Sequence, residues 1–376
     1  MHGALGSAVV HDLRGAYEPT QTAMEPITVE PDSNLSVARL LDANLDRARE
    51  GLRVIEDWCR FGLDRDDFVV QLKDWRQRLG QLHDDDYRRA RSAATDTAAG
   101  LSHPAQANRS SAPAIIKANA SRAQEALRVL EEFGRNRDQA LAHAAAEIRY
   151  KLYDLEVRIL DACVHHHRHQ SLKNAKLCLI TDPDRDNDLE RLMHGVEAAL
   201  IAGVTLVQYR RKQGSDQRRF LEAKALRKLC RRFEALLIIN DRIDLALLVD
   251  ADGVHLGQED LPTTEARRLI GHERLLGRST HTVDQLLVAQ QEGADYLGVG
   301  PVFATKTKPE RLPEGLTWVN EASRHGAVPW FAIGGIDAGT VNAVCDAGAK
   351  RSAVVSAIMG SDDPEGASRT LLQALS

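Results

Sequence analysis

Residues 236–260, LLIINDRIDLALLVDADGVHLGQED, carry the pattern that indicates the fold of the C-terminal half of this chain. The stretch holds two short apolar runs, each as long as one fully buried strand and each followed directly by polar residues. The pattern recurs on both sides of the stretch. It predicts eight strands, at 176–181, 205–210, 235–240, 253–257, 275–279, 296–300, 329–334 and 352–356.

Amphipathic helical segments, such as 187–202, 216–232 and 284–292, separate most of these strands. Alternating strands and helices are typical of the α/β class, and eight such units predict a (β/α)8 TIM barrel over 172–376. An open doubly wound sheet is the alternative. That fold usually has a glycine-rich loop after its first strand, and TDPDRDN at 181–187 contains no glycine.

The N-terminal half has a different pattern, which predicts an all-α domain over 35–164. Residues 41–56 align with residues 116–131, so the domain contains an internal helical repeat. Each copy has one apolar stripe and, beside it, a second row that begins with Asn and Arg, which we expect near a packed helix junction. Residues 1–34 lack periodicity and are expected to be a mobile tail. The His-rich segment 165–171 is expected to be a solvated linker, with metal binding as the alternative.

Composition limits the classes of function. A length of 376 residues fits two domains, and a net charge of −5 argues against nucleic-acid or membrane-surface partners. The five cysteines form no CxxC pair, which indicates a reduced, cytoplasmic protein. No apolar stretch approaches the roughly 20 residues of a membrane span. We therefore expect small-molecule partners, and a homo-oligomer is compatible with the sequence.

Several predicted strands end in side chains that bind phosphate or metal, and the C-terminal ends of barrel strands converge on one face. Gln208, Arg210 and Lys212 share one side of the second strand, because residues alternate faces. Asp241 and Asp260 follow adjacent strands and together could share Mg²⁺, which prefers oxygen ligands. Either aspartate alone could instead cap a helix. The pair beside a phosphate-binding set favours the metal.

A second anion site is indicated at the later strands. The hydroxyl-rich and lysine-rich loop 305–308 follows the sixth strand, and Gly335 and Ser356 follow the seventh and eighth. Backbone N–H groups at these last two strands form the usual phosphate site of such barrels. Two anion sites, one built on cations and metal and one on backbone, predict two phosphorylated substrates.

The motifs of the C-terminal half resemble those of a known family. VQYRRK, IINDRIDLAL, ADGVHLGQEDLP, STHT, GADYLGVGPVFATKTK, AIGGI and VVSAI, in this order, make residues 172–376 similar to thiamine-phosphate synthase. The resemblance implies a Mg²⁺-dependent transferase that joins 4-amino-2-methyl-5-hydroxymethylpyrimidine diphosphate to thiazole phosphate and releases pyrophosphate. A paralogue that only isomerises thiazole phosphate is the alternative.

The resemblance also implies roles for single residues. The residues implied for the pyrimidine diphosphate are Gln208, Tyr209, Arg210, Arg211, Lys212, Asn240, Ser279 and Lys308. Those implied for the thiazole phosphate are Thr305, Lys306, Thr307, Gly335, Val355 and Ser356. Asp241 and Asp260 would hold the metal. Arg211 stands where the family often has an acid, and it is expected to face away from Gln208 without consequence for the site.

The N-terminal half resembles a helical domain fused to such synthases and linked to phosphorylation of the pyrimidine monophosphate. No P-loop supports this activity from the residues alone. Its candidate anion-site residues are Asn44, Arg47, Asn119 and Arg122, with junction packing as the alternative. A non-catalytic oligomerisation module is the rival role for the domain. Charged rows around Glu56 and Glu131 are expected to be solvated ion pairs.

Overall fold

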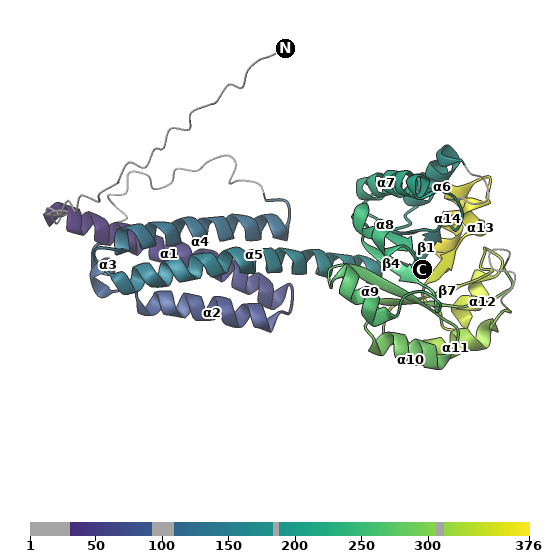
Figure 1. The fold of residues 1–376 in the computed structure, drawn as a ribbon. Helices are drawn as coiled ribbons and strands as arrows, with labels where there is room; N and C mark the ends of the chain where they lie inside the picture. The colour runs from purple at the N-terminus through teal and green to yellow at the C-terminus, as the bar shows by residue number, and fades with distance from the viewer. Residues whose placement is uncertain (1–30, 92–108, 183–187, 306–311) are drawn as a thin grey trace, which may run out of the picture.

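The computed structural model describes residues 31–91, 109–182, 188–305 and 312–376. Its N-terminal half is a bundle of helices that lie side by side, and its C-terminal half is a closed barrel (Figure 1). The bundle consists of α1 (Pro31–Phe61), α2 (Asp66–Gln81), α3 (Asp85–Arg89), α4 (Ala112–Gly134) and α5 (Gln139–Asn174). Both apolar stripes of the repeat are buried in its core, from Leu41 to Ile55 and from Ile116 to Leu130.

Two predicted boundaries need correction. The first helix begins at Pro31, inside the predicted tail, and residues 1–30 lie outside the described part of the chain. The predicted linker 165–171 is not a connector, because it continues the 36-residue helix α5. No glycine or proline interrupts α5, and buried side chains run along it from Leu141 through Cys163 and Arg168 to Leu172. One helix therefore passes from the bundle to the barrel (Figure 1).

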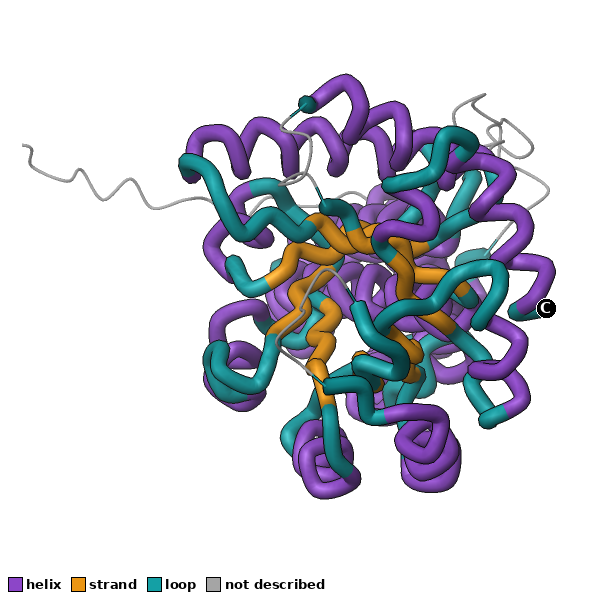
Figure 2. Tube along the Cα trace, turned by 90° about the vertical axis from the view of Figure 1, so that its right-hand side faces the viewer, coloured by secondary structure: helices purple, strands orange, loops and turns teal. Residues whose placement is uncertain are grey.

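The barrel confirms the predicted fold class. Its eight parallel strands follow chain order around the ring, and β1 closes it by pairing with β8. Seen from the end, the ring of strands is enclosed by helices (Figure 2). The strands are β1 (Leu177–Ile180), β2 (Leu206–Tyr209), β3 (Leu236–Asn240), β4 (Gly253–Leu256), β5 (Leu275–Thr280), β6 (Tyr296–Val299), β7 (Trp330–Ile333) and β8 (Ser352–Val354). The helices are α6 (Leu189–Ile201), α7 (Asp216–Arg232), α8 (Ile243–Leu248), α9 (Thr263–Ile270), α10 (Val283–Gln291), α11 (Gly315–His325), α12 (Val341–Asp346), α13 (Ser356–Met359) and α14 (Pro364–Ala374).

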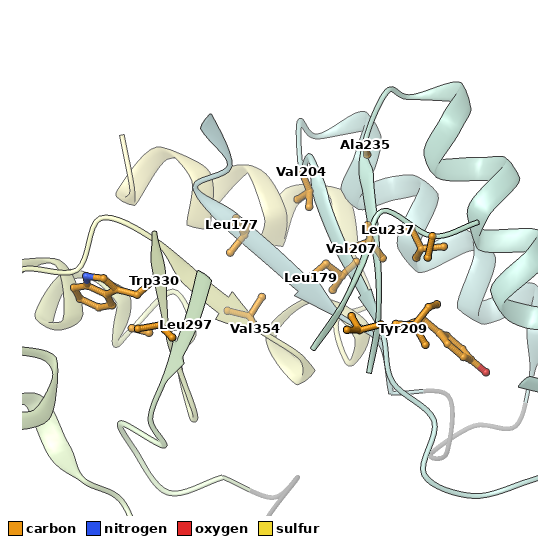
Figure 3. Close-up of a cluster of buried hydrophobic side chains, with 14 of the residues drawn as sticks. Leu177, Leu179, Val204, Val207, Tyr209, Ala235, Leu237, Leu297, Trp330 and Val354 are labelled. Atoms are coloured by element: carbon orange, nitrogen blue, oxygen red, sulfur yellow. The ribbon is translucent and has the colours of Figure 1, made fainter. Parts of the chain in front are cut away.

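Strand alternation divides the apolar side chains of the barrel into two cores. Outward-facing residues such as Leu179, Val207 and Leu237 pack under the helices (Figure 3). Inward-facing residues fill the barrel axis, where Tyr296 and Phe331 meet edge to face with ring centroids 5.9 Å apart. The interior is therefore a packed core, and the polar strand ends lie above it.

The end of α5 closes the barrel at the N-terminal side of the strands. Leu172 is buried in the inner core together with residues of β1, β2 and β3. One turn earlier, the buried Arg168 donates from Nε to Asp252 at 3.0 Å and from Nη1 to the carbonyl of Glu273 at 2.9 Å. Arg227 of α7 reaches the same carboxylate at 2.6 Å. This network fixes the bundle to the barrel end opposite the polar strand termini.

The remaining structural predictions concern cysteines and membrane spans. All five cysteines are free, and four of them are buried. Within the described ranges, no helix combines the length and apolar character that crossing a bilayer requires.

Candidate active site

A cavity opens at the C-terminal ends of the strands, on the inward side of the barrel. Gln208 of β2, Asn240 of β3 and Ser279 of β5 line it, together with Arg210 just beyond β2. The N–H of Arg210 donates to the buried hydroxyl of Thr181 at 3.0 Å, which fixes the end of β2 beside β1. The sequence placed these four polar residues at three separate strand ends, and the structure brings them together.

A second hollow adjoins the first and shares Arg210, Asn240 and Ser279 with it. Its other charged lining residues are Lys212, Asp241, Glu259 and Asp260. Lys212 forms an ion pair with Asp241. One wall of the barrel mouth therefore carries the cations Arg210 and Lys212 at the end of β2, next to carboxylates at the ends of β3 and β4.

The two aspartates lie close enough to influence each other. Asp241 has a φ of +63°, in the left-handed region, and its N–H donates to the carbonyl of His255 at 2.9 Å. Asp260 accepts the N–H of Gly257 at 2.6 Å. Burial raises the pKa of Asp260, and the neighbouring charge of Asp241 raises it further. The protein thus holds two carboxylates together at a cost in electrostatic repulsion.

This pair fits a magnesium site. Among the described residues no group of three His, Cys, Asp or Glu side chains could enclose a metal. Magnesium, however, is commonly held by one or two carboxylates, with water and substrate phosphate completing its shell. Two mutually repelling carboxylates beside Arg210 and Lys212 provide that partial set of hard oxygen ligands.

The opposite wall of the cavity is formed by residues that follow β7 and β8. Gly334, Gly335, Val355 and Ser356 line it after β7 and β8, and Thr305 of the loop after β6 also lines the cavity. Gly335 has a φ of +64°, and a Cβ there would lie 2.7 Å from the carbonyl oxygen of Ala304. Only glycine fits this position. The loop and the start of α13 present a backbone surface of the kind that binds phosphate.

Tyr209 and Arg211 are not placed as the resemblance implied. Their side chains point to the outer side of β2, where both contact Glu222 of α7 and not the cavity. The Tyr209 hydroxyl donates to Glu222 at 2.7 Å, and Arg211 donates at 2.7 and 3.0 Å. Arg211 does face away from Gln208, but it is a buried structural residue and is not without consequence.

His255 and Gln258 are among the polar residues that line the site but do not belong to the predicted set of site residues. His255 lines the cavity, with Nε2 2.9 Å from the Ser279 hydroxyl and Nδ1 3.2 Å from the Tyr296 hydroxyl. Gln258 donates to the carbonyl of Ser279 at 2.5 Å. Alternation along β4 could have identified His255, because it shares the inward face with Gly253. The position of Gln258 depends on a loop turn that no period reveals.

Three predicted site residues, Lys306, Thr307 and Lys308, lie outside the described ranges. The four N-terminal candidates are placed in the bundle, where Asn44 and Asn119 are buried and Arg47 and Arg122 are exposed. The prediction that the charged rows around Glu56 and Glu131 are solvated ion pairs is wrong for the two glutamates. Glu56 is 3% exposed and pairs with Arg76 of α2 at 2.8 Å, and Glu131 pairs with Arg149 of α5 at 2.8 Å.

The second row of each repeat, expected at a packed junction, is packed only in part. Gly51 and Ala126 are buried between α1 and α4. Further along each row, Trp58 is 37% exposed and its counterpart Phe133 is 47% exposed. The second row is therefore buried at Gly51 and Ala126 but partly exposed to solvent at Trp58 and Phe133.

Fold and site together define a barrel enzyme that acts on small molecules at the mouth of the barrel. The family model described as thiamine monophosphate synthase matches residues 177–358, and that of the ThiD2 family matches residues 39–158. The thiamine-phosphate synthase of Synechococcus sp. strain CC9311 is 76% identical over 352 residues, which cover 94% of this chain and 100% of the relative. That of Nostoc sp. strain PCC 7120 is 48% identical over 352 residues, covering 94% and 98%.

A solved structure agrees with these relatives. The thiamine phosphate pyrophosphorylase from Pyrococcus furiosus is 35% identical, with a TM-score of 0.50, and the match covers 55% of this chain and 96% of that one. The chain belongs to the thiamine-phosphate synthase family and is a transferase of thiamine biosynthesis. The resemblance drawn from the barrel motifs is thereby confirmed.

Proposed function

We propose that the barrel joins 4-amino-2-methyl-5-hydroxymethylpyrimidine diphosphate to thiazole phosphate and releases pyrophosphate. The observation that carries this proposal is the pair of adjoining hollows that share Arg210, Asn240 and Ser279. One wall holds cations and carboxylates and the other holds backbone, so two phosphorylated ligands can lie side by side. An isomerase of thiazole phosphate alone would have no use for the wall of cations and carboxylates.

The pyrimidine diphosphate would lie against β2, β3 and β5. Gln208, Asn240 and Ser279 offer donors and acceptors to the ring edge. Arg210 and Lys212 would hold the diphosphate oxygens, and Asp241 and Asp260 would hold Mg²⁺. Tyr209 and Arg211 would support this strand end from behind, through Glu222. The thiazole phosphate would lie against the backbone of Gly335, Val355 and Ser356 and beside Thr305.

The chemistry requires charge stabilisation and positioning. The bond between the pyrimidine methylene carbon and the diphosphate oxygen breaks, and its electron pair leaves with the pyrophosphate. The ring amino group stabilises the resulting cation, and the thiazole nitrogen donates its lone pair to form the new carbon–nitrogen bond. Arg210 and Lys212 neutralise the departing charge, and bound Mg²⁺ would add Lewis-acid stabilisation of the phosphate oxygens. No nucleophilic side chain takes part.

The experiment is a synthase assay with a matched pair of lysine variants. Both substrates are supplied with Mg²⁺, and thiamine phosphate and pyrophosphate are expected to form in equal amounts. Lys212→Ala should lower kcat/KM for the diphosphate about 10-fold or more, because a charge-assisted contact is lost. Lys228→Ala removes an exposed lysine of α7 away from the mouth and should leave it unchanged. Equal rates for the two variants would contradict the assignment.

We also infer a second activity, phosphorylation of the pyrimidine monophosphate by the helical half. It is supported by the match to the ThiD2 family over 39–158 together with the resemblance of this half to such a domain. The full chain is incubated with ATP, Mg²⁺ and the monophosphate, without thiazole phosphate, so that diphosphate accumulates. If no diphosphate forms, the rival role as an oligomerisation module is favoured.

A further inference from the structure

The duplicated sequence of the bundle brings both copies of one polar motif to a single face. Asn44, Arg47 and Glu50 of α1 and Arg122 and Glu125 of α4 line one hollow between these helices. In the repeat, Arg47 corresponds to Arg122 and Glu50 to Glu125. The hollow is therefore centred where the two copies meet. We call it the paired-arginine groove.

An adjoining hollow extends the groove along the same helices. It shares Glu50 and Arg122 with the first and adds Asn119, the counterpart of Asn44. Both asparagines are buried, and each donates from Nδ2 to the carbonyl four residues earlier, at 2.8 Å. This bond fixes the amide plane and leaves the side-chain oxygen as an acceptor. Each end of the groove thus has one oriented acceptor.

Close helix packing holds the groove together. A Cβ added to Gly51 would lie 2.8 Å from the carbonyl oxygen of Asn119 and 3.2 Å from the Cβ of Ala123. Any side chain at this position would force α1 and α4 apart. The absence of a side chain at Gly51 lets the two helices approach closely, so that Arg47 of α1 and Arg122 of α4 line one hollow.

The two arginines differ in their ion pairing from several other arginines of the bundle. Within the described parts of the chain neither Arg47 nor Arg122 forms an ion pair, whereas Arg53, Arg76 and Arg149 pair with carboxylates at 2.8 or 2.9 Å. The nearby Glu125 is held by the hydroxyl of Ser121, which donates to it at 3.0 Å. Two guanidinium groups that face one hollow without a carboxylate partner are suited to a phosphate ester.

We propose that the paired-arginine groove binds the phosphate monoester of the aminopyrimidine. Arg47 and Arg122 hold the phosphate, and the oxygen of Asn44 or Asn119 accepts from the ring amino group. Glu50 and Glu125 balance the charges of Arg47 and Arg122 in the first hollow, so that selection there depends on directed guanidinium contacts. The identity of the ligand rests on the kinase function proposed for this half, whereas the place of binding rests on the groove itself.

Calorimetric titration of the full chain with the pyrimidine monophosphate tests the proposal. All proteins in this titration carry Arg210→Ala, which removes a phosphate contact of the pyrimidine site proposed in the barrel and so weakens binding there. Arg47→Ala and Arg122→Ala should each weaken binding about 10-fold, and the double variant should abolish it at millimolar ligand. Arg60→Ala on α1 and Arg128→Ala on α4 remove the same charge from exposed positions outside the groove and should bind normally.

The outcomes separate the site from the function. Normal binding by Arg47→Ala and Arg122→Ala, with circular dichroism unchanged, would overturn the site. If the chain forms diphosphate from monophosphate and ATP while both variants keep the wild-type KM, the kinase function stands and the groove is wrong. If binding is lost in both variants but the wild type makes no diphosphate, the groove stands and the kinase function fails. Partial recovery in Arg47→Lys would support a phosphate contact over a packing role.

Discussion

Removing the carboxylate of Glu222 should destabilise the barrel strongly, although this residue touches no proposed ligand. Glu222 is 2% exposed and accepts the Tyr209 hydroxyl at 2.7 Å and two bonds from Arg211 at 2.7 and 3.0 Å. Arg218 also donates to it, at 2.9 Å, but the side chain of Arg218 is 34% exposed and its share is small. Glu222→Ala would leave Arg211 inside the protein without this counter-charge.

The magnitude follows from these contacts. Removing one partner of a buried ion pair costs about 3–5 kcal/mol, and stranding a buried hydroxyl costs about 1–3 kcal/mol. The two costs share one network and are not additive, and Arg211 has a further contact that remains. We expect the free energy of unfolding of the barrel to fall by about 3–4 kcal/mol. Glu265→Ala, at an exposed residue of α9, should change it by less than about 1 kcal/mol.

Urea denaturation at pH 7, followed by hydrogen exchange in peptides of β2 and α7, separates the barrel from the bundle. Burial acts to raise the pKa of Glu222, but hydrogen bonds from Arg211, Arg218 and Tyr209 outweigh it, so the pKa is lowered. The stabilisation by Glu222 is therefore present above the ordinary pKa of a glutamate and is lost as the pH falls through the folded value. The difference in the free energy of unfolding between wild type and Glu222→Ala should become smaller below about pH 4. If Glu222→Ala lowers the free energy of unfolding by less than about 1 kcal/mol at pH 7, the reasoning is refuted.

Three further predictions follow from the site and the bundle. Asp241→Asn should lower kcat about 10²–10³-fold at saturating Mg²⁺, measured by pyrophosphate release, and turnover near the wild-type value would contradict the metal assignment. Burial and the charge of Asp241 raise the pKa of Asp260, so ionised Asp260 destabilises the folded state once the pH exceeds its ordinary pKa. Asp260→Asn without divalent ions should therefore melt higher than wild type at pH 7, with the difference vanishing at acid pH; a lower melting temperature at pH 7 would count against it. Gly51→Ala should destabilise the bundle by about 1–2 kcal/mol in urea, because overpacking against Asn119 exceeds the gain in helix propensity. Gly80→Ala meets only ordinary contacts, at 3.5 Å and beyond, and should stabilise instead; the same sign for both glycines would refute the packing argument.

The barrel could be predicted from sequence because its signals are local. A short apolar run that is buried on both faces is recognisable without its neighbours, and each of the eight predicted strands overlaps an observed one. The meeting of Arg210, Asp241 and Asp260 followed from topology, because parallel strands place their C-terminal ends on one face. The internal repeat of the bundle was visible for the same reason, since its apolar stripes have a helical period.

The errors concern residues whose environment is set by distant partners. The sequence of segment 165–171 is that of a polar connector. In the structure, Arg168 of this segment is buried and forms an ion pair with Asp252, 84 residues away. Glu56 and Glu131 resemble surface charges and are covered by arginines from other helices. Arg211 faces away from Gln208 as expected, but the substrate contact implied for it is wrong, because Glu222 of the following helix binds its side chain. Periodicity in the sequence indicates which face of a helix or strand a side chain lies on. The partner that contacts this side chain is known only from the fold.

The continuity of α5 determines where this chain can be divided. A barrel expressed from residue 172 onward would keep Leu172 but lose Arg168. Asp252 and the carbonyl of Glu273 would then lose a hydrogen-bond donor at the N-terminal end of the strands. A separately expressed barrel should therefore begin upstream of Arg168, within the helix that both halves share. Insertion of a single residue into α5 would also turn one half by about 100° against the other, since each helical residue adds that rotation. The orientation of the two halves is thus encoded in the residue count of one helix.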